Sequence, residues 1–502
     1  MRGIDHWQFA PYRPYHQQEE ACMPFICRLA PGHDSIELEW FDRGDAPDGH
    51  QLCWREREGK WPWRSCACTE RVMQLKGLHE DCDYELQVLR RDGSGSSAVR
   101  LARTGTVPGQ VVNYLHPQDP VYAFSGRALC SPSLLHLPGG ALLASMDLFA
   151  PNGPQNLTIL CRSDDDGLSW HYVTDLFPCY WGTLFWHRER LYMLACSTEY
   201  GDLLIGCSLD EGKTWTRPVH LLVGSSSAQA AGWQKTPVPM INHDGRIFMS
   251  IDYGAWQEGG HSIGLLSVPE DADLLDPLNW TCSELIAYDP AWPGAPQGKS
   301  SGLLEGNMVV APDGRLLNIL RVGLAGCQPS HGLAVALQAD SRQVEAPLRF
   351  DRFVALPSGS NSKTHILFDE QSGQYIAIGN ICVDEATPAQ RNVLALQVSS
   401  DLENWRIVKL LLDYREDNPA ETGFQYISFL FDGPDLCYLS RTALNGARNF
   451  HDANYITYHR VHNFRQLLDA PSRSCAEAEN SESEQDNPDV TVERGSDGKT
   501  EA

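Results

Sequence analysis

The chain reads Arg162-Ser163-Asp164-Asp165-Asp166-Gly167-Leu168-Ser169-Trp170 in one of its turns, and this stretch predicts the fold. It returns as Cys207-Ser208-Leu209-Asp210-Glu211-Gly212-Lys213-Thr214-Trp215, so both copies read Ser-x-Asp-x-Gly-x-Ser/Thr-Trp. In a tight hairpin turn of this kind, Asp accepts backbone N–H bonds, Gly supplies a positive φ, and Trp packs back under the turn. One such turn in roughly every 40–65 residues is typical of a β-propeller.

Weaker copies of the turn extend the repeat along the chain. Asp276-Pro277-Leu278-Asn279-Trp280 and Ser399-Ser400-Asp401-Leu402-Glu403-Asn404-Trp405 each follow an apolar run. A strand-like run at 333–337 fills the gap between them, and 456–464 shows the same strand-then-aromatic pattern. The repeat therefore predicts an all-β fold with a six-bladed β-propeller over residues 121–468 and no long helix.

The composition of the 502-residue chain suits a large β-protein. Hydrophobic residues make up 42%, enough for two or three domains, and 42 Gly, 31 Pro and 14 Trp suit a turn-rich fold. The formal net charge of −25 argues against nucleic acid as a partner. The 16 Cys lack the paired spacing of a zinc site, so we expect no metal, no cofactor and mostly reduced, buried thiols.

Targeting and membrane signals are not evident in the sequence. No stretch approaches the length of a transmembrane helix, and the start Met1-Arg2-Gly3-Ile4-Asp5-His6-Trp7 has no apolar core of a signal peptide. We expect no membrane partner and a cytoplasmic location, unless a signal has been removed.

Outside the propeller, one region has the pattern of a second β-domain. Ser35-Ile36-Glu37-Leu38-Glu39-Trp40 and Asp83-Tyr84-Glu85-Leu86-Gln87-Val88 alternate polar and apolar residues, which predicts a small β-sandwich in front of the propeller. Trp40 and the step from Gly77-Leu78 to Tyr84 resemble a fibronectin type III module. The predicted regions are an N-terminal arm at 1–24, the sandwich at 25–107, a Pro/Gly-rich linker at 108–120, the propeller at 121–468, and an acidic disordered tail at 469–502.

Polar residues precede the first apolar run of most blades. In a propeller the innermost strands surround the axis, so residues at these strand starts should converge on one face. Arg127, Lys235, Glu305, Lys363 and Tyr426 hold this position. Their charges lean cationic, so the ring suits an anionic small ligand, with a carboxylate as the simplest candidate.

The repeated turns, the blade count and this ring resemble the sialidase (neuraminidase) superfamily, whose members are six-bladed propellers with Asp-box turns, also called BNR repeats. The resemblance implies cleavage of terminal sialic acids from glycans with retention. It also implies a Tyr nucleophile activated by a Glu, an Asp as acid/base, and three Arg that bind the substrate carboxylate.

Several positions match this pattern. Glu305 is followed by a strand ending in Arg321, and Arg391 lies shortly before the turn at 399–405, in the family's order. Tyr426-Ile427-Ser428 resembles the element that carries the nucleophile. The resemblance therefore implies Tyr426 as nucleophile, Glu305 as its base, and Arg321 and Arg391 as carboxylate ligands.

Two positions depart from it. The family's first Arg directly precedes Ile-Pro, whereas here Cys130-Ser131 precedes Pro132 and the nearest candidate is Arg127. The loop expected to hold the acid contains one carboxylate, Asp147, which lies early.

Further contacts are predicted from position alone. Lys235 and Lys363 are candidate substrate contacts at strand starts, with solvated strand-end lysines as the competing interpretation. The polar segment 440–454 could cover the site with Arg441, His451 and Asp452, and a structured closing loop is its alternative.

Three functions stay open at this point. The first is a sialidase-like retaining exo-glycosidase acting on a terminal acidic sugar of a glycan. The second is another glycoside hydrolase or lyase on an acidic polysaccharide, with Asp147, Glu305 or Asp452 as general acid and base. The third is a carbohydrate-binding propeller without catalysis.

Overall fold

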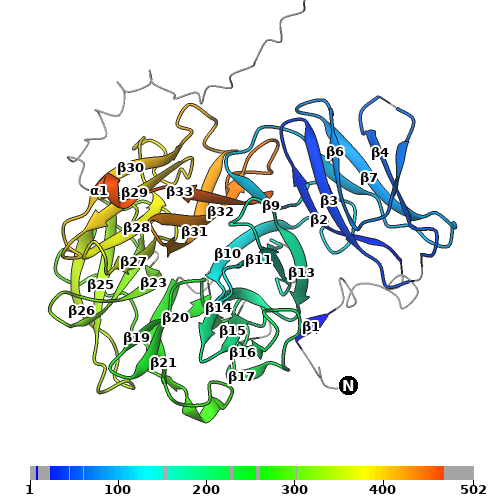
Figure 1. Cartoon of the computed structure of the whole chain (residues 1–502). Coiled ribbons are helices and arrows are strands. Elements are labelled where there is room, and N and C mark those ends of the chain that lie inside the picture. Colours follow the sequence, from blue (N-terminus) through cyan, green and yellow to red (C-terminus); the bar gives the residue numbers. More distant parts are fainter. Residues whose placement is uncertain are drawn as a thin grey trace, which may run out of the picture.

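The chain folds into β-strands that form a small sandwich and a six-bladed propeller (Figure 1). The structure, a computed structural model, describes residues 7–9, 23–44, 46–59, 61–151, 153, 155–225, 230–255, 260–300 and 302–468. The predicted acidic tail and most of the predicted N-terminal arm lie outside the described residues. None of the helices within these ranges is long and apolar enough to span a membrane.

The blades are antiparallel sheets that follow one another along the chain, as predicted. Blades one and two contain β10 (Ala128–His136), β11 (Leu142–Phe149), β12 (Thr158–Ser163), β13 (His171–Leu176), β14 (Tyr180–His187), β15 (Arg190–Cys196), β16 (Leu203–Ser208) and β17 (Val219–Leu222). Blades three and four contain β18 (Gly232–Gln234), β19 (Ile241–His243), β20 (Arg246–Ala255), β21 (Gly260–Pro269), β22 (Thr281–Cys282), β23 (Gly302–Val310), β24 (Leu316–Gly323), β25 (Leu333–Ala339) and β26 (Arg349–Ala355). Blades five and six contain β27 (His365–Asp369), β28 (Gln374–Asn380), β29 (Val393–Ser399), β30 (Arg406–Asp413), β31 (Gly423–Asp432), β32 (Asp435–Ala443) and β33 (Tyr455–Val461). A short 3₁₀ helix, η4 (Pro277–Asn279), and a short helix, α1 (Arg465–Leu468), complete the propeller.

The ring closes where the last blade meets the first. Inner strand β31 contacts β10, and β10 contacts β14 on its other side, so blade six lies beside blade one (Figure 1). Strand β9 (Gln110–Tyr114) pairs with β33 and supplies the fourth strand of blade six, with Tyr114 opposite Tyr455. The segment predicted as a linker therefore contains a propeller strand. A strand from before the first blade thus completes the last one as its outermost strand, which ties the beginning of the propeller to its end.

The turns that predicted the fold share one hydrogen-bond pattern. In the first, Asp165 accepts from the backbone N–H of Ser169 (2.9 Å) and from its hydroxyl (2.6 Å), and Trp170 Nε1 donates to Gly167 O (3.1 Å). Asp210 and Asp401 hold their turns in the same way. The weaker copy at 276–280 differs, because there Asp276 caps η4.

The sandwich consists of a three-stranded and a four-stranded sheet. Alternate residues of Ser35–Phe41 and Asp83–Arg90 are buried, as the period-two pattern predicts. The strands are β2 (Phe25–Pro31), β3 (Ser35–Phe41) and β6 (Val72–Lys76) in one sheet, and β5 (Arg64–Cys68), β4 (His50–Glu56), β7 (Asp83–Arg90) and β8 (Arg100–Arg103) in the other.

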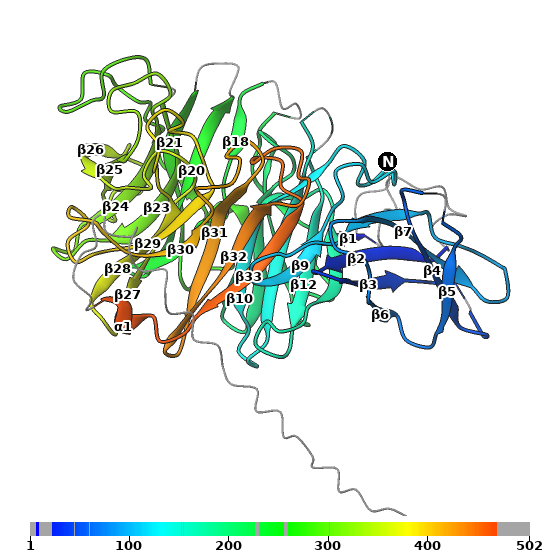
Figure 2. The ribbon, with the colours of Figure 1, turned by 90° about the horizontal axis from the view of Figure 1, so that it is seen from above.

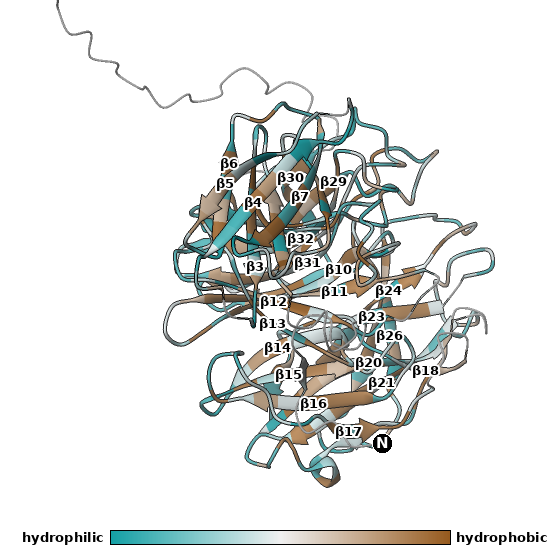
Figure 3. Cartoon of the chain, turned by 90° about the vertical axis from the view of Figure 1, so that its right-hand side faces the viewer, coloured by the Kyte–Doolittle hydropathy of each residue, from teal (hydrophilic) through white to brown (hydrophobic). Residues whose placement is uncertain are grey.

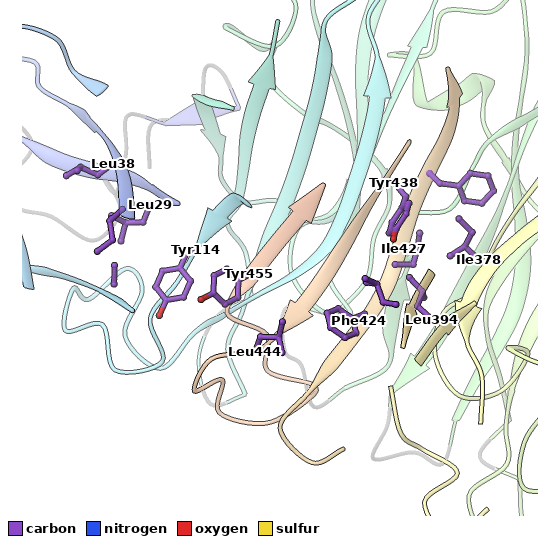
Figure 4. Close-up of a cluster of buried hydrophobic side chains, with 14 of the residues drawn as sticks. Leu29, Leu38, Tyr114, Ile378, Leu394, Phe424, Ile427, Tyr438, Leu444 and Tyr455 are labelled. Carbon is purple, nitrogen blue, oxygen red and sulfur yellow. The ribbon is translucent and has the colours of Figure 1, made fainter. Parts of the chain in front are cut away.

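The sandwich packs against the propeller at blade six (Figure 2). One apolar core runs from Leu29 and Leu38 of the sandwich through Tyr114 to Tyr455 and Phe424 of the blade (Figure 4). The strands of the propeller are largely apolar, and β16, brown over much of its length in Figure 3, is buried at all six residues. Strand β1 (Gln8–Phe9) of the N-terminal arm pairs with β13 of blade one.

Candidate active site

Four inner strands carry the same local distortion near their starts. Ser131, Trp181, Glu305 and Tyr426 each have a positive φ, between 47° and 58°. Each coincides with a register shift between the inner strand and the second strand of its blade. A bulge re-aims a side chain, and a positive φ at a residue other than Gly costs of order 1–3 kcal/mol. Strain repeated at one level of the propeller indicates a site at the axis.

The second strand of three of these blades places a charged residue beside the bulge. Asp147 pairs with Cys130, Arg321 with Leu304, and Arg441 with Gln425. In blades one, four and six a charged residue thus pairs with the residue before the bulge, whereas in blade two the partner is Cys196. Charged side chains therefore recur beside the bulges. Their signs differ from blade to blade, and so do their tasks.

The two Asp side chains of this level hold bulges of the next blade. Asp252 Oδ2 accepts the backbone N–H of Glu305 (3.0 Å), and Asp147 Oδ2 accepts that of Trp181 (2.8 Å). Thr158 donates to the other oxygen of Asp147 at 2.5 Å. Burial raises the pKa of Asp147 to about 7 and that of Asp252 to about 8. Asp147 was predicted as the acid, but both of its carboxyl oxygens accept hydrogen bonds from within the protein.

Glu305 is held by an arginine of its own blade. Arg321 Nη1 donates to Glu305 Oε2 at 2.9 Å. The same guanidinium donates to the backbone oxygens of Ser360 (3.1 Å) and Asn361 (3.0 Å), which fixes its orientation. Burial alone would lower the pKa of Arg321, but the Glu305 carboxylate and the Tyr426 hydroxyl outweigh it and raise that pKa. The predicted order of Glu305, Arg321 and Tyr426 thus corresponds to a real cluster.

Two further guanidinium groups lie at the ring of Tyr426. The Cζ atom of Arg391 is 5.8 Å and that of Arg441 is 5.2 Å from the ring centroid. Arg391 reaches this place because its backbone oxygen accepts the N–H of Phe424, at the start of β31 (2.8 Å). Arg391 Nε and Arg441 Nε are buried and have no hydrogen-bond partner within the described residues. Terminal nitrogens of both groups are engaged within the protein, since Arg391 donates to Gln425 Oε1 and Asn361 O, and Arg441 Nη2 donates to His451 O.

Arg127 directly precedes the inner strand β10, and it stays a predicted substrate contact. The guanidinium groups with the strongest effect on Tyr426 are those of Arg321, Arg391 and Arg441. Arg127 is buried, and its backbone N–H donates to Phe124 O (2.9 Å) in the segment before blade one. The third guanidinium at Tyr426 is therefore that of Arg441, from the second strand of blade six.

The charges of this cluster are unbalanced. Burial and the Glu305 carboxylate raise the pKa of Tyr426, while the three arginines lower it, and the net direction is upward. Burial and the neighbouring Arg321 and Arg441 lower the pKa of Arg391 to about 10. Two buried guanidinium groups and the partly exposed one of Arg321 outnumber the nearby carboxylates of Glu305 and Asp452, which leaves an excess of positive charge. An anion bound there would relieve this repulsion.

Lys235 and Lys363 are buried at the same level of the propeller. Lys235 Nζ donates to Trp181 O (3.0 Å) and Thr183 Oγ1 (2.5 Å), and Lys363 Nζ donates to Pro237 O (2.6 Å). Burial lowers the pKa of each amine to about 7. Both amines therefore donate to the protein itself. Lys235 links blade three to blade two, whereas Lys363, just before the first strand of blade five, bonds to the blade-three segment between β18 and β19.

The segment after β32 lies over Arg441. Arg441 Nη2 donates to His451 O, and His451 Nδ1 lies 3.0 Å from Asp452 Oδ1. The Arg441 charge, together with burial, lowers the pKa of His451 to about 4, so the imidazole is neutral at neutral pH. Asn449 Oδ1 accepts the backbone N–H groups of both 451 and 452. The segment is an ordered turn, and it places His451 against Phe149 and Arg441.

Sequence reasoning missed the blade-three side of the site. Asp252, His261 and Tyr200 were not singled out, although His261 Nε2 lies 3.3 Å from the Tyr200 hydroxyl and feels the Glu305 charge. One signal was available, because Ser250-Ile251-Asp252 repeats the pattern of Ser145-Met146-Asp147 on the second strand of its blade. Within the described ranges, no group of three or more His, Cys, Asp or Glu side chains is placed to hold a metal ion.

Comparison with known proteins finds only distant similarity to solved structures. No family model matches the chain, and no match is found among curated protein sequences. An α-L-arabinanase of Penicillium chrysogenum in complex with arabinobiose has 15% identity and a TM-score of 0.49, over 73% of this chain and 99% of that chain. An α-L-arabinofuranosidase of Fusarium graminearum with an iminosugar inhibitor has 12% identity and a TM-score of 0.46, over 71% and 96%. A β-fructofuranosidase of Bombyx mori has 12% identity and a TM-score of 0.37, over 63% and 77%. The chemistry of this chain is therefore argued from its own residues.

Proposed function

We propose that this chain is a glycoside hydrolase that removes a terminal acidic sugar, sialic acid or a related carboxylated sugar, with retention of anomeric configuration. The observation that carries the proposal is the convergence of Arg321, Arg391 and Arg441 on Tyr426 beside one carboxylate, Glu305. A planar guanidinium binds a carboxylate through paired N–H donors, so three of them form a strong carboxylate site.

The nucleophile follows from the electrostatics of the substrate. A carboxylate on the sugar would repel an anionic nucleophile, whereas a neutral phenol approaches without that cost. The raised pKa of Tyr426 keeps it neutral at neutral pH, so its proton must leave as it attacks. Glu305, held by Arg321, is the acceptor for that proton. Glycosidases with a Tyr nucleophile are known exceptions to the two-carboxylate pattern, and the sialidases are among them.

The reaction then has two displacements. In the first, the Tyr426 oxygen bonds to the anomeric carbon, the glycosidic C–O bond breaks, and the departing oxygen receives a proton. In the second, water attacks the anomeric carbon and the Tyr426 oxygen leaves and recovers its proton from Glu305. Two inversions at one carbon give net retention. The arginines hold the sugar in place throughout, because its carboxylate does not react.

Turnover of 4-methylumbelliferyl glycosides tests the proposal. The panel contains several acidic sugars, among them sialic acid and a uronic acid, and one neutral sugar, α-L-arabinofuranose. We expect hydrolysis of an acidic glycoside and, by NMR, first release of the sugar with the anomeric configuration of the substrate. Hydrolysis of the neutral glycoside alone would contradict an acidic substrate. Binding of an acidic sugar without turnover would instead favour a carbohydrate-binding propeller.

A further inference from the structure

The proposed reaction requires an acid that protonates the departing oxygen, and both oxygens of Asp147 are already engaged. We infer that Glu199 is this acid, and the inference rests on the proposed function. Its place in the fold, its contacts and its surroundings support the assignment as follows.

Glu199 lies at the same end of the propeller as the bulges. It belongs to the connection between β15, which ends at Cys196, and β16, which begins at Leu203. Cys196 pairs with Tyr180, the residue before the bulge at Trp181. The connection is closed by a backbone hydrogen bond from Ser197 N to Asp202 O (2.8 Å), so its conformation is defined.

The residue next to Glu199 joins this connection to the reacting cluster. Tyr200 is buried with a φ of 58°, and its ring lies 6.4 Å from that of Trp181 and 5.7 Å from that of His261. His261 in turn feels the charge of Glu305. The bulges of blades two, four and six bring Trp181, Glu305 and Tyr426 to the axis, and Glu199 lies on the blade-two side. Contacts thus connect the residue next to Glu199 with the surroundings of Glu305, and the proposal places the leaving group of the sugar on this side.

The contacts of Glu199 leave one oxygen available. Gln155 Nε2 donates to Glu199 Oε2 (2.9 Å), and the same nitrogen donates to Ala150 O (3.3 Å). Within the described residues, no hydrogen bond to Oε1 of Glu199 occurs. Gln155 is 5% exposed, and its own Oε1 is buried without a hydrogen-bond partner there. The buried amide of Gln155 thus fixes Oε2 of Glu199, while its own Oε1 lies close by as an unused acceptor. This arrangement is expected of a site that accommodates a hydroxyl group.

The protonation state of Glu199 is consistent with an acid. Burial raises the pKa of this carboxyl to about 7, although the hydrogen bond from Gln155 lowers it. A carboxyl that titrates near neutral pH can donate a proton and later accept one. In the first displacement its proton passes to the glycosidic oxygen as the C–O bond breaks. In the second, the resulting carboxylate takes a proton from the attacking water, so the cycle restores the acid.

A series of aryl and alkyl glycosides of the best acidic sugar tests the assignment in the whole protein. Glu199→Gln keeps the size of the side chain but removes its proton. A leaving group that is stable as an anion needs no acid, so kcat/KM for a dinitrophenyl glycoside, which reports the first displacement, should stay within about tenfold of wild type. A poor leaving group such as an alkyl alcohol should react roughly 10²–10⁴-fold more slowly. Azide should accelerate release of the enzyme-bound sugar in the variant, because it attacks without base assistance.

Two further variants serve as controls. Glu189→Gln, an exposed position in the turn between β14 and β15, should match wild type with every leaving group. Gln155→Met removes the donor to Glu199 and should change the rate for poor leaving groups more than for good ones. An equal loss for all leaving groups in Glu199→Gln, or no loss, would overturn the role of Glu199 while leaving the proposed function intact. Absence of turnover by the wild type would overturn the proposed function itself.

Discussion

Arg321 Nη1 donates to Glu305 Oε2 across 2.9 Å, and the two residues come from neighbouring strands of blade four. Because Arg321 pairs with Leu304 across the strands, the bulge at Glu305 turns the carboxylate toward the guanidinium. In the proposed reaction, Arg321 thereby orients the carboxylate that accepts the Tyr426 proton. The proposal gives the same residue a second role, the binding of the acidic sugar.

The first prediction concerns the coupling of Tyr426 with Glu305. Tyr426→Phe removes one hydroxyl, so ligand binding should change little while the rate falls by roughly two or more orders of magnitude. The rate of the Glu305→Gln variant should fall by a similar factor. Because the two groups act as one unit, the double variant should be little slower than either single variant. Steady-state rates and calorimetric binding of the free sugar measure both effects, and additive losses would contradict the coupling.

The second prediction concerns the carboxylate ligands. Arg391→Lys and Arg441→Lys keep a cation but lose the planar fork, so KM for an acidic glycoside should rise roughly 10- to 100-fold. The loss should be far smaller for an analogue in which the sugar carboxylate is reduced to an alcohol. Arg448, a more exposed arginine in the turn after β32, provides the matched control as Arg448→Lys. Equal effects on both substrates would show that the arginines support the fold rather than the carboxylate.

The third prediction separates the two aspartates that hold bulges. Asp252→Ala and Asp147→Ala each leave one buried N–H group unpaired, so each should lower the free energy of unfolding by about 1–3 kcal/mol. Asp252 holds Glu305, whereas Asp147 holds Trp181, so Asp252→Ala should reduce kcat more at a similar cost in stability. Chemical denaturation and kcat measured on the same preparations give the comparison. Asp147→Asn retains an acceptor, so a selective loss with poor leaving groups in that variant would restore Asp147 as the acid.

The fold was predictable from the sequence because its signals are local. The turn at 162–170 carries its own hydrogen bonds between Asp165 and Ser169, so the same residues form the same turn wherever they recur. The sequence prediction of a six-bladed, all-β propeller is confirmed. The exact start of the propeller was harder to predict, because β9 pairs with β33, which lies more than 300 residues later in the chain.

The site was only partly predictable, because its residues meet through the bulges. A bulge advances one strand by a residue relative to its partner, which no spacing in the sequence displays. Arg441 approaches Tyr426 because it pairs with Gln425, the residue before the bulge. The prediction of Arg127 relied on its place before an apolar run, and that place lies outside the bulged strand β10. The task of Asp147 likewise depends on Trp181, in the next blade.

The last prediction concerns pH and the buried amine of Lys363. Burial lowers its pKa from 10.5 to about 7, so between these two values the unfolded chain binds the proton and the folded chain does not. The free energy of unfolding contributed by this group therefore rises with pH from 7 to 10.5, by up to about 5 kcal/mol, and is constant below 7. Lys363→Met removes this titration while it retains the apolar stem.

Urea denaturation of wild type and variant between pH 7 and 10 measures the effect of Lys363. The free energy of unfolding of Lys363→Met should rise less steeply with pH than that of wild type, since the variant lacks a proton that only the unfolded chain binds. Lys76→Met, at an exposed position on β6, should keep the wild-type slope. The lost hydrogen bond to Pro237 O shifts the whole Lys363→Met curve downward but leaves its slope unaffected. Parallel curves for Lys363→Met and wild type would mean that the amine stays protonated inside the propeller, where it would then add a further cation beside Glu305.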